Sequence, residues 1–362
     1  MRITAITPIT LAIPYAYDGP RHQVGGKSWD TLDILLVRVD TDAGLTGWGE
    51  AFGHGSIPAT RAALETLVAP ALLGADATDI AGTMRTAQQA MHLFGRGGPV
   101  TYALSGVDIA LWDLMGKRAG LPLYQLLGGS TRASVPAYAS LLRYSNPAVV
   151  ARNAALAVAQ GYRVVKLHEV TLSAVQAARE AIGSEVLLMN DTNCCWSVAD
   201  AASMAEDMRP CDLHWLEEPV WPPEDWRGLA RVRATGVPVA AGENAGTVLD
   251  FVAAFEAGAL DVAQPSVTKI GGVTEMRKVI ALAEAYGVRV VPHCAYFGPG
   301  FLASLHVAAT LPGPVPLERL FLDLEASPFA SWTEATGGRL TIPQGPGLGC
   351  DPDPAVTERY RI

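Results

Sequence analysis

The pattern of hydrophobic and polar residues changes at about residue 130. Before that point, two apolar runs within 34–53 flank Asp-Ala-Gly, which predicts a β-hairpin. Apolar residues at helical spacing over 59–74 and 79–118 predict helices. The second helical stretch should end at Gly120, because two basic residues stand in its last turn. The N-terminal third is therefore expected to form strands followed by helices.

Beyond residue 130, short β-rich runs alternate with alanine-rich helical segments such as 146–161, 172–183 and 275–287. The eight predicted strands lie near 135–140, 162–168, 185–191, 213–217, 237–242, 260–264, 287–292 and 315–319. This alternation predicts parallel strands joined by helical crossovers, and eight strands favour a closed barrel. An open, doubly wound sheet is the alternative, but it would need a glycine-rich phosphate loop after its first strand, which the sequence lacks.

Length and composition narrow the class of protein. A chain of 362 residues exceeds the usual size of one core, so a large and a smaller domain are expected. The net charge of -9, without a run of basic residues, argues against a nucleic-acid partner. No apolar stretch approaches the ~18 residues of a membrane helix, and the N-terminus lacks signal-peptide features. Five cysteines without a CxxC pair argue for a reducing compartment. We expect a soluble, cytoplasmic protein without a membrane partner.

Polar residues stand at the ends of seven predicted barrel strands. One position from each strand gives a series with steps of 24 to 26 residues, which is one strand–helix unit each time. The series is Lys166, Asp191, Glu217, Glu243, Lys269, His293 and Glu318. Because the carboxyl ends of barrel strands share one rim, where barrel active sites lie, these side chains should face a common pocket.

Three carboxylates of this series, Asp191, Glu217 and Glu243, come from adjacent strands. Crowded together, they would raise one another's pKa unless a cation joined them. A hard divalent ion with oxygen ligands, such as Mg²⁺, meets this need. The alternative is that each acid caps the following helix or pairs with a surface base. Equal spacing favours the metal site.

Candidate proton carriers lie on both sides of the triad. Lys166 and His168 are two positions apart on one strand, so both face inward, and His293 lies on the other side of the pocket. A carboxylate substrate held at the metal could give up its α-proton to either side. The ammonium of Lys166 should keep His168 neutral and able to accept a proton. Alternatively, the histidines are structural and Lys166 binds the substrate carboxylate.

Glu318 has two possible roles. With a raised pKa it could donate a hydrogen bond to the substrate carboxylate, which would stabilise negative charge there. Alternatively, it pairs with Arg319 or with another base.

At these residues the chain resembles the enolase superfamily, and within it the mandelate racemase/muconate lactonizing enzyme family. The resemblance covers nearly the whole chain. It is carried by segment 101–129 and by the motifs NDTN, LEEP, AGEN, PHCA and LERLFLDL, which contain Asp191, Glu217, Glu243, His293 and Glu318. The closing TIPQGPGLGCDPD is similar to the family's usual ending.

The resemblance implies an α/β fold with three parts: an α+β capping domain over 1–127, a modified TIM barrel of (β/α)7β type over 128–335, and a tail over 336–362 that returns to the cap. It also implies one Mg²⁺ per active site, a small carboxylate substrate and a homo-oligomer, a dimer or an octamer.

The chain departs from the family pattern at two positions. The usual Lys-x-Lys of the second strand is Lys166-Leu167-His168 here, so His168 takes the place of the base. Ser266 stands where racemase-type members carry an Asp that partners the seventh-strand His. Because a hydroxyl cannot raise the basicity of His293 as a carboxylate would, His293 should act mainly as a general acid or find another partner. For Lys269 we predict a structural role.

Substrate specificity in this family comes largely from two cap loops, which here correspond to about 16–30 and 52–58. His22 and His54 on these loops could contact substrate or be solvated. Arg143, after the first barrel strand, could bind a second anionic or hydroxylated end. The remaining predicted substrate contacts are Asn193, Ser266 and Tyr296.

The resemblance favours a dehydratase that converts a sugar acid to a 2-keto-3-deoxy acid, because a histidine acid suits a departing hydroxyl. A racemase or epimerase is the second reading, and a cycloisomerase of a sugar lactone or anhydro-sugar acid is the third. A structural or ligand-binding barrel would predict a broken metal triad, whereas the triad in this sequence is intact.

Overall fold

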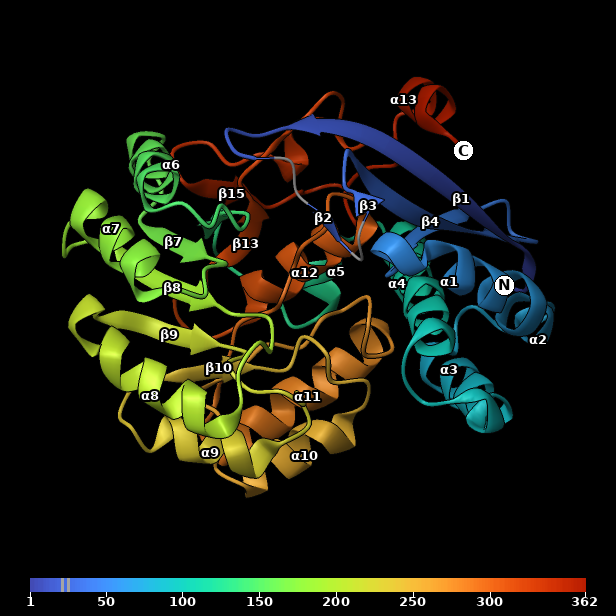
Figure 1. The fold of residues 1–362 in the computed structure, drawn as a ribbon. Coiled ribbons are helices and arrows are strands. Elements are labelled where there is room, and N and C mark those ends of the chain that lie inside the picture. Colours follow the sequence, from blue (N-terminus) through green and yellow to red (C-terminus); the bar gives the residue numbers. More distant parts are fainter. Residues whose placement is uncertain (21–22, 25–26) are drawn as a thin grey trace.

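The computed structural model describes residues 1–20, 23–24 and 27–362, which form a smaller cap beside a larger barrel (Figure 1). The cap contains an antiparallel sheet of order β14-β1-β4-β5. Its strands are β1 (Ile3–Ala16), β4 (Thr31–Thr41), β5 (Thr46–Ala51) and the short β14 (Asp323–Leu324). The predicted hairpin is confirmed, since β4 and β5 pair from Leu35 opposite Ala51 to Asp40 opposite Thr46. A two-stranded ribbon, β2 (Gln23–Val24) with β3 (Lys27–Ser28), follows β1.

Helices of the cap cover one face of this sheet and bury an apolar core of their own. They are α1 (Ile57–Ala63), a π-helical segment (Leu64–Val68), α2 (Ala69–Leu72), α3 (Ile80–Ala90) and α4 (Pro99–Ala119). As predicted, α4 ends at Gly120, whose φ of 67° lies in the left-handed region. Strand β5 lies directly against α4, because a Cβ on Gly49 would come within 1.8 Å of the Gly106 oxygen.

The barrel consists of eight parallel strands in the order β12-β11-β10-β9-β8-β7-β6-β13, and each lies at a predicted position. They are β6 (Ser134–Ser140), β7 (Val164–Leu167), β8 (Leu187–Asp191), β9 (Leu213–Glu217), β10 (Val239–Ala241), β11 (Val262–Ala263), β12 (Arg289–Val290) and β13 (Leu317–Leu320). Because the last strand pairs with the first, the open doubly wound alternative is wrong.

Helices alternate with these strands. They are α5 (Leu123–Leu126), α6 (Pro147–Ala159), α7 (Leu172–Ile182), α8 (Val198–Met208), α9 (Trp226–Arg233), α10 (Val248–Glu256), α11 (Gly272–Tyr286) and α12 (Pro299–Thr310). Short 3-10 turns occupy His54–Ser56, His92–Phe94, Arg209–Cys211 and Ala330–Thr333. No helix in the described part of the chain is long and apolar enough to cross a membrane.

Side-chain alternation explains how the barrel presents its polar rim. One layer of the interior is a buried cluster of Tyr138, Val164, Met189, Trp215, Ala240, Val262 and Val291, contributed by six strands and by the residue that follows β12. Side chains two residues further along a strand point the same way. Lys166, Asp191, Glu217 and His293 each stand two positions beyond a member of this layer, so they face inward at the carboxyl ends of the strands.

Helix α4 fixes the cap against the barrel through one of its faces. Its Trp112 donates from Nε1 to Thr274 Oγ1 over 3.0 Å, and its Asp108 Oδ1 accepts from the Thr274 backbone N–H over 3.0 Å. Ser105 Oγ accepts from Gly271 N over 2.8 Å. The three α4 residues share a face because they are three and four positions apart.

The C-terminal segment contacts both the barrel and the cap. Strand β15 (Arg339–Thr341) first pairs antiparallel with β6 of the barrel. The chain then reaches the cap, where Leu348 N donates to Asp113 Oδ1 of α4 over 2.8 Å. Helix α13 (Pro354–Tyr360) ends next to β1, where Ile362 N donates to the Thr10 carbonyl over 3.0 Å (Figure 1).

Candidate active site

A cavity of about 500 Å³ lies where the cap meets the carboxyl ends of the strands. Seven of the predicted site residues line it: His54, Arg143, His168, Asn193, Glu243, His293 and Glu318. Lys166, Asp191 and Glu217 are fully buried. Lys166 contacts Glu318 and Asp191 contacts His168 of the lining, and Glu217 contacts Lys166. His22 lies outside the described residues. The barrel thus brings together side chains from seven of its strand ends.

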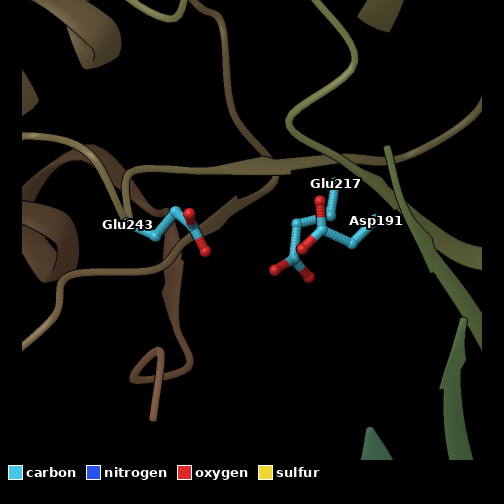
Figure 2. A group of neighbouring side chains, drawn as sticks. All are labelled: Asp191, Glu217 and Glu243. Atoms are coloured by element: carbon cyan, nitrogen blue, oxygen red, sulfur yellow. The ribbon is translucent and has the colours of Figure 1, made fainter. Parts of the chain in front are cut away.

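The three predicted metal ligands form one cluster. Asp191, Glu217 and Glu243 each offer a carboxylate oxygen, and these oxygens lie within 4.8 Å of one another (Figure 2). Trp215 Nε1 donates to Glu217 Oε2 over 2.8 Å, and Asn193 N donates to Asp191 Oδ1 over 2.8 Å. Such outer contacts hold ligand carboxylates in place. An all-oxygen, triply anionic donor set suits a hard divalent cation such as Mg²⁺.

Lys166 partly neutralises this acidic cluster. Its Nζ lies 2.7 Å from Glu217 Oε1, 2.8 Å from Glu318 Oε1 and 3.5 Å from Asp191 Oδ2. Even so, burial raises the pKa of Glu217 to about 7, and the charges of Asp191 and Glu318 add to that rise. The full ionisation of Glu217 therefore calls for more positive charge than one ammonium supplies. Despite their burial, the pKa of Asp191 is lowered by Lys166 and His168, and that of Glu243 by His293 and Lys269.

His168 is held between a carbonyl and a metal-ligand candidate. The Leu141 carbonyl oxygen lies 2.5 Å from Nδ1, so Nδ1 carries the proton and donates it. Nε2 lies 3.3 Å from Asp191 Oδ2. Burial lowers the pKa of His168, but the hydrogen bond and charge of Asp191 outweigh it and raise that pKa.

Lys166 lowers the pKa of His168, which is the direction that the sequence predicts, but the Asp191 carboxylate exerts a larger effect in the opposite direction. A divalent cation held by Asp191 would offset that negative charge and would lower the pKa of the His168 imidazole.

His293 has partners at both ring nitrogens. Its Nε2 lies 3.0 Å from Glu243 Oε2 and 3.9 Å from Glu318 Oε2. Its Nδ1 lies 3.3 Å from the Tyr296 hydroxyl, which in turn contacts the Ser266 hydroxyl. The partner that the sequence leaves open is thus a tyrosine. The sequence predicts substrate contacts for Ser266 and Tyr296, whereas the structure places both behind His293 and outside the cavity lining.

Glu318 is paired with a base. Burial raises its pKa, but Lys166 and His293 outweigh that effect and lower the pKa to about 2. The Ser140 hydroxyl and the Cys294 N–H also donate to its two oxygens, over 2.8 and 3.0 Å. Of the two roles that the sequence leaves open for Glu318, this geometry fits pairing with a base rather than donation to a substrate carboxylate. The base is Lys166, since Arg319 pairs with Glu334.

Arg143 joins three strand ends at the cavity wall. It donates to the His168 carbonyl over 2.6 Å, the Thr192 carbonyl over 3.2 Å and Asn193 Oδ1 over 3.1 Å. These acceptors are neutral, so its positive charge can also serve an anionic or hydroxylated group in the cavity.

The cap closes the cavity with aromatic rings. Phe52 and Trp29 line it, and His54 packs edge-on against them with ring centroids 5.0 and 5.5 Å away. Burial lowers the pKa of His54 to about 4, so this ring is neutral near pH 7. Its Nδ1 is buried without a hydrogen-bond partner among the described residues.

Lys269 belongs to the lining, although the sequence predicts a structural role for it. Its Nζ lies 4.3 Å from the centre of the Phe52 ring and 3.8 Å from Glu243 Oε1. Its place in the regular series of strand-end residues was the signal that could have found it. Trp29 and Phe52 fall within the two cap loops that the family resemblance places over the site, but no spacing singles them out, because their distance to the barrel rim depends on how the cap docks.

The fold and the carboxylate cluster define a capped (β/α) barrel protein with a site on the carboxyl rim. The chain belongs to the mandelate racemase/muconate lactonizing enzyme family of the enolase superfamily. Residues 11–128 match the family's N-terminal domain, and residues 149–356 match the enolase C-terminal domain-like family.

Similar proteins include sugar-acid enzymes. The chain is 34% identical to D-galactarolactone cycloisomerase of Agrobacterium fabrum, over 100% of this chain and 99% of the relative. It is 31% identical to arabinonate dehydratase of Saccharolobus solfataricus, over 93% of each. A solved racemase from Streptomyces coelicolor with bound magnesium superposes with a TM-score of 0.87 at 32% identity, over 99% of this chain and 100% of that one.

Proposed function

We propose that this protein is a Mg²⁺-dependent lyase that removes the proton next to the carboxylate of a sugar acid and expels the hydroxyl on the neighbouring carbon. The observation that carries the proposal is the placement of His168 and His293 on the lining of one cavity that also contains Glu243 of the acid cluster. Along the barrel, β13 and β6 separate their strands on one side, and β8 to β11 separate them on the other. A base and an acid on opposing walls suit an elimination.

Asp191, Glu217 and Glu243 would hold the Mg²⁺. When bound, the ion supplies positive charge that offsets the negative charge arising on the substrate carboxylate. Its fit is supported by the all-oxygen donor set, two members of which are buried, and by the raised pKa of Glu217, whose ionisation calls for further positive charge.

His168 is the proposed base. Because its Nδ1 donates to the Leu141 carbonyl, Nε2 is the nitrogen that can take the α-proton. The Cα–H bond breaks first, and its electron pair moves into the carboxylate, which becomes an ene-diolate. That electron pair then returns to form a double bond to the β-carbon as the β-carbon–oxygen bond breaks. His293 gives its Nε2 proton to the departing oxygen, which leaves as water. The enol that remains becomes the 2-keto-3-deoxy acid. Lys166 holds Glu217 and Glu318 in position.

A cycloisomerase is the second candidate, and the similarity to D-galactarolactone cycloisomerase favours it. The same proton transfers apply, but the departing oxygen belongs to a ring and stays attached to the product. No water is released. For a racemase, His293 would have to act as a base, and its Nδ1 partner is a hydroxyl rather than a carboxylate.

The direct test incubates the purified protein and Mg²⁺ with aldonates, aldarates, their lactones and anhydro-sugar acids, and measures the products by mass and by carbonyl trapping. A product one water lighter supports the dehydratase. A keto product of unchanged mass supports the cycloisomerase.

The variant that tests the metal site is Glu217→Gln, which keeps the size of the side chain but removes a ligand charge. We expect turnover to be abolished by this change, as by chelation of Mg²⁺ in the unchanged protein. Unaltered turnover in Glu217→Gln would contradict the proposal.

A further inference from the structure

We propose that Tyr296, held by Ser266, is a positioning residue that fixes the ring of His293 for proton delivery from Nε2. The inference rests on the proposed function, in which His293 is the acid. It concerns two side chains that do not line the cavity and that the proposed chemistry does not otherwise use.

The two ring nitrogens of His293 have different surroundings. On the Nε2 side lie the carboxylate oxygens of Glu243 and Glu318, at 3.0 and 3.9 Å. On the Nδ1 side lies the Tyr296 hydroxyl at 3.3 Å, and the tyrosine ring stands at 84° to the imidazole with centroids 5.8 Å apart. Nε2 therefore faces the reacting groups, and Nδ1 faces a hydroxyl.

Hydrogen-bond direction follows from this arrangement. An imidazole that gives a proton from Nε2 keeps the other proton on Nδ1 both before and after the transfer. A tyrosine oxygen can accept from Nδ1–H while its own proton goes to another acceptor. The Ser266 hydroxyl is in contact with it and can be that acceptor. The pair thus suits both states of the ring and needs no rearrangement during the transfer.

The two hydroxyls are themselves held firmly. Ser266 is fully buried and Tyr296 is 4% exposed. Ser266 and His293 are paired in a parallel bridge beyond the ends of β11 and β12. The loop between His293 and Tyr296 is anchored where Cys294 N donates to Glu318 Oε2 over 3.0 Å. The tyrosine oxygen consequently has little freedom to leave the imidazole.

Loss of the Tyr296 hydroxyl should leave Nδ1 without its partner and should free the ring to turn. Proton delivery to the departing oxygen would then slow, because general acid catalysis depends on the position of the acid. Removal of the α-proton by His168 occurs on the other wall and should continue. The predicted signature is a change in the partition between exchange and product formation, which a general loss of structure would not produce.

The experiment compares Tyr296→Phe and Ser266→Ala with the unchanged protein during turnover in D₂O with Mg²⁺. It measures deuterium entering the α-position of recovered substrate and the rate of product formation. For Tyr296→Phe we expect product formation to fall about 10- to 100-fold, the usual range for a lost supporting contact, with a raised ratio of exchange to product. Ser266→Ala should move the ratio in the same direction, but less.

Tyr102→Phe is the matched control, because it also removes one tyrosine hydroxyl. The Tyr102 ring packs against Phe52, with ring centroids 5.0 Å apart, and does not line the cavity. The ratio in Tyr102→Phe should equal that of the unchanged protein. An unchanged ratio in both Tyr296→Phe and Ser266→Ala overturns the proposal, whether or not the rates fall together.

A second measurement does not depend on activity. Long-range ¹H–¹⁵N spectra of the seven histidine rings, with His293→Asn for assignment, report which nitrogen of His293 carries the proton. We expect Nδ1–H in the unchanged protein and altered His293 nitrogen shifts in Tyr296→Phe. Identical shifts overturn the positioning role. If the unchanged protein acts on no sugar acid, but the His293 nitrogen shifts still change in Tyr296→Phe, the proposed function is refuted and the positioning role is not.

Discussion

At the residue scale, Lys166 has the most demanding environment in the site. It is fully buried, and its ammonium lies within 3.5 Å of three carboxylates that are also buried. Burial by itself lowers the pKa of an ammonium, but these acids outweigh it and hold the pKa of Lys166 well above its usual range. Lys166 is therefore charged, and its charge permits the acids to remain close together.

The first prediction concerns Lys166→Met. Without the ammonium, Glu217 and Glu318 lose a close partner in a buried setting, so the free energy of unfolding without Mg²⁺ should fall by about 3–5 kcal/mol. Urea unfolding measures it. Lys278→Met is the control, because Lys278 is half-exposed and its pair with Glu275 should contribute about 1 kcal/mol or less. Equal stability of the two variants would contradict the role given to Lys166.

The identities of most rim residues could be predicted from sequence, because spacing by one strand–helix unit places Lys166, Asp191 and His293 on one rim. Their electrostatics could not, since the pKa of His168 depends on its distance to Asp191. The Tyr296 partner of His293 was also beyond the sequence, because a contact between a loop and a ring nitrogen leaves no periodic pattern.

At the scale of elements, β5 and α12 meet through one buried acid. Glu50 of β5 accepts a hydrogen bond from Gly300 N at the start of α12 over 2.8 Å. Burial raises the pKa of Glu50 to about 8, although the N–H groups of Gly300 and Gly298 lower it in part. This contact links the cap to the helix that follows the His293 loop.

The second prediction follows from the sign of that shift. A carboxyl group whose pKa is higher in the folded state stabilises the fold fully below its ordinary pKa of 4.5 and loses that contribution as pH rises through about 8. The melting temperature of the unchanged protein should therefore fall more steeply over this pH window than that of Glu50→Gln.

Thermal unfolding across that window measures the difference. Glu65→Gln serves as the control, because Glu65 is exposed and pairs with Arg61 on the surface. Glu65→Gln should keep the pH dependence of the unchanged protein. Parallel curves for Glu50→Gln and the unchanged protein would be the contrary result.

Element positions were largely predictable from periodicity, and their lengths were not. All eight barrel strands lie at their predicted positions, yet β11 and β12 are two-residue strands within longer apolar runs. The helix predicted over 59–74 contains a π-helical segment at Leu64–Val68. Strand β15 pairs with β6 before the chain reaches the cap. These details follow from packing between distant segments, which periodicity within one segment does not contain.

At the scale of the whole molecule, the metal should contribute to the stability of the fold. A ligand that binds only the folded state at 100 times its Kd stabilises by about 2.7 kcal/mol. The third prediction is that Mg²⁺ raises the melting temperature of the unchanged protein but not that of Glu217→Gln. Scanning calorimetry with and without Mg²⁺ tests this, and an equal response of both proteins would argue against a metal at this cluster.

Cap and barrel together make the cavity, and this limits what sequence alone can predict. The barrel rim follows from strand periodicity, whereas Phe52 and His54 reach the cavity because α4 docks onto the start of α11. Under the proposed function, these cap side chains would contact the substrate. The sequence therefore predicts the class of reaction more directly than it predicts which substrate is used.

Proton NMR can follow the α-proton of the substrate directly. The protein is mixed with Mg²⁺ and a panel of sugar acids in D₂O, alongside His168→Asn and His293→Asn. With the unchanged protein we expect loss of the α-signal and growth of a 3-deoxy methylene signal. We expect exchange without product in His293→Asn, and neither in His168→Asn. Exchange that persists in His168→Asn, or that proceeds without Mg²⁺, would contradict the proposed function.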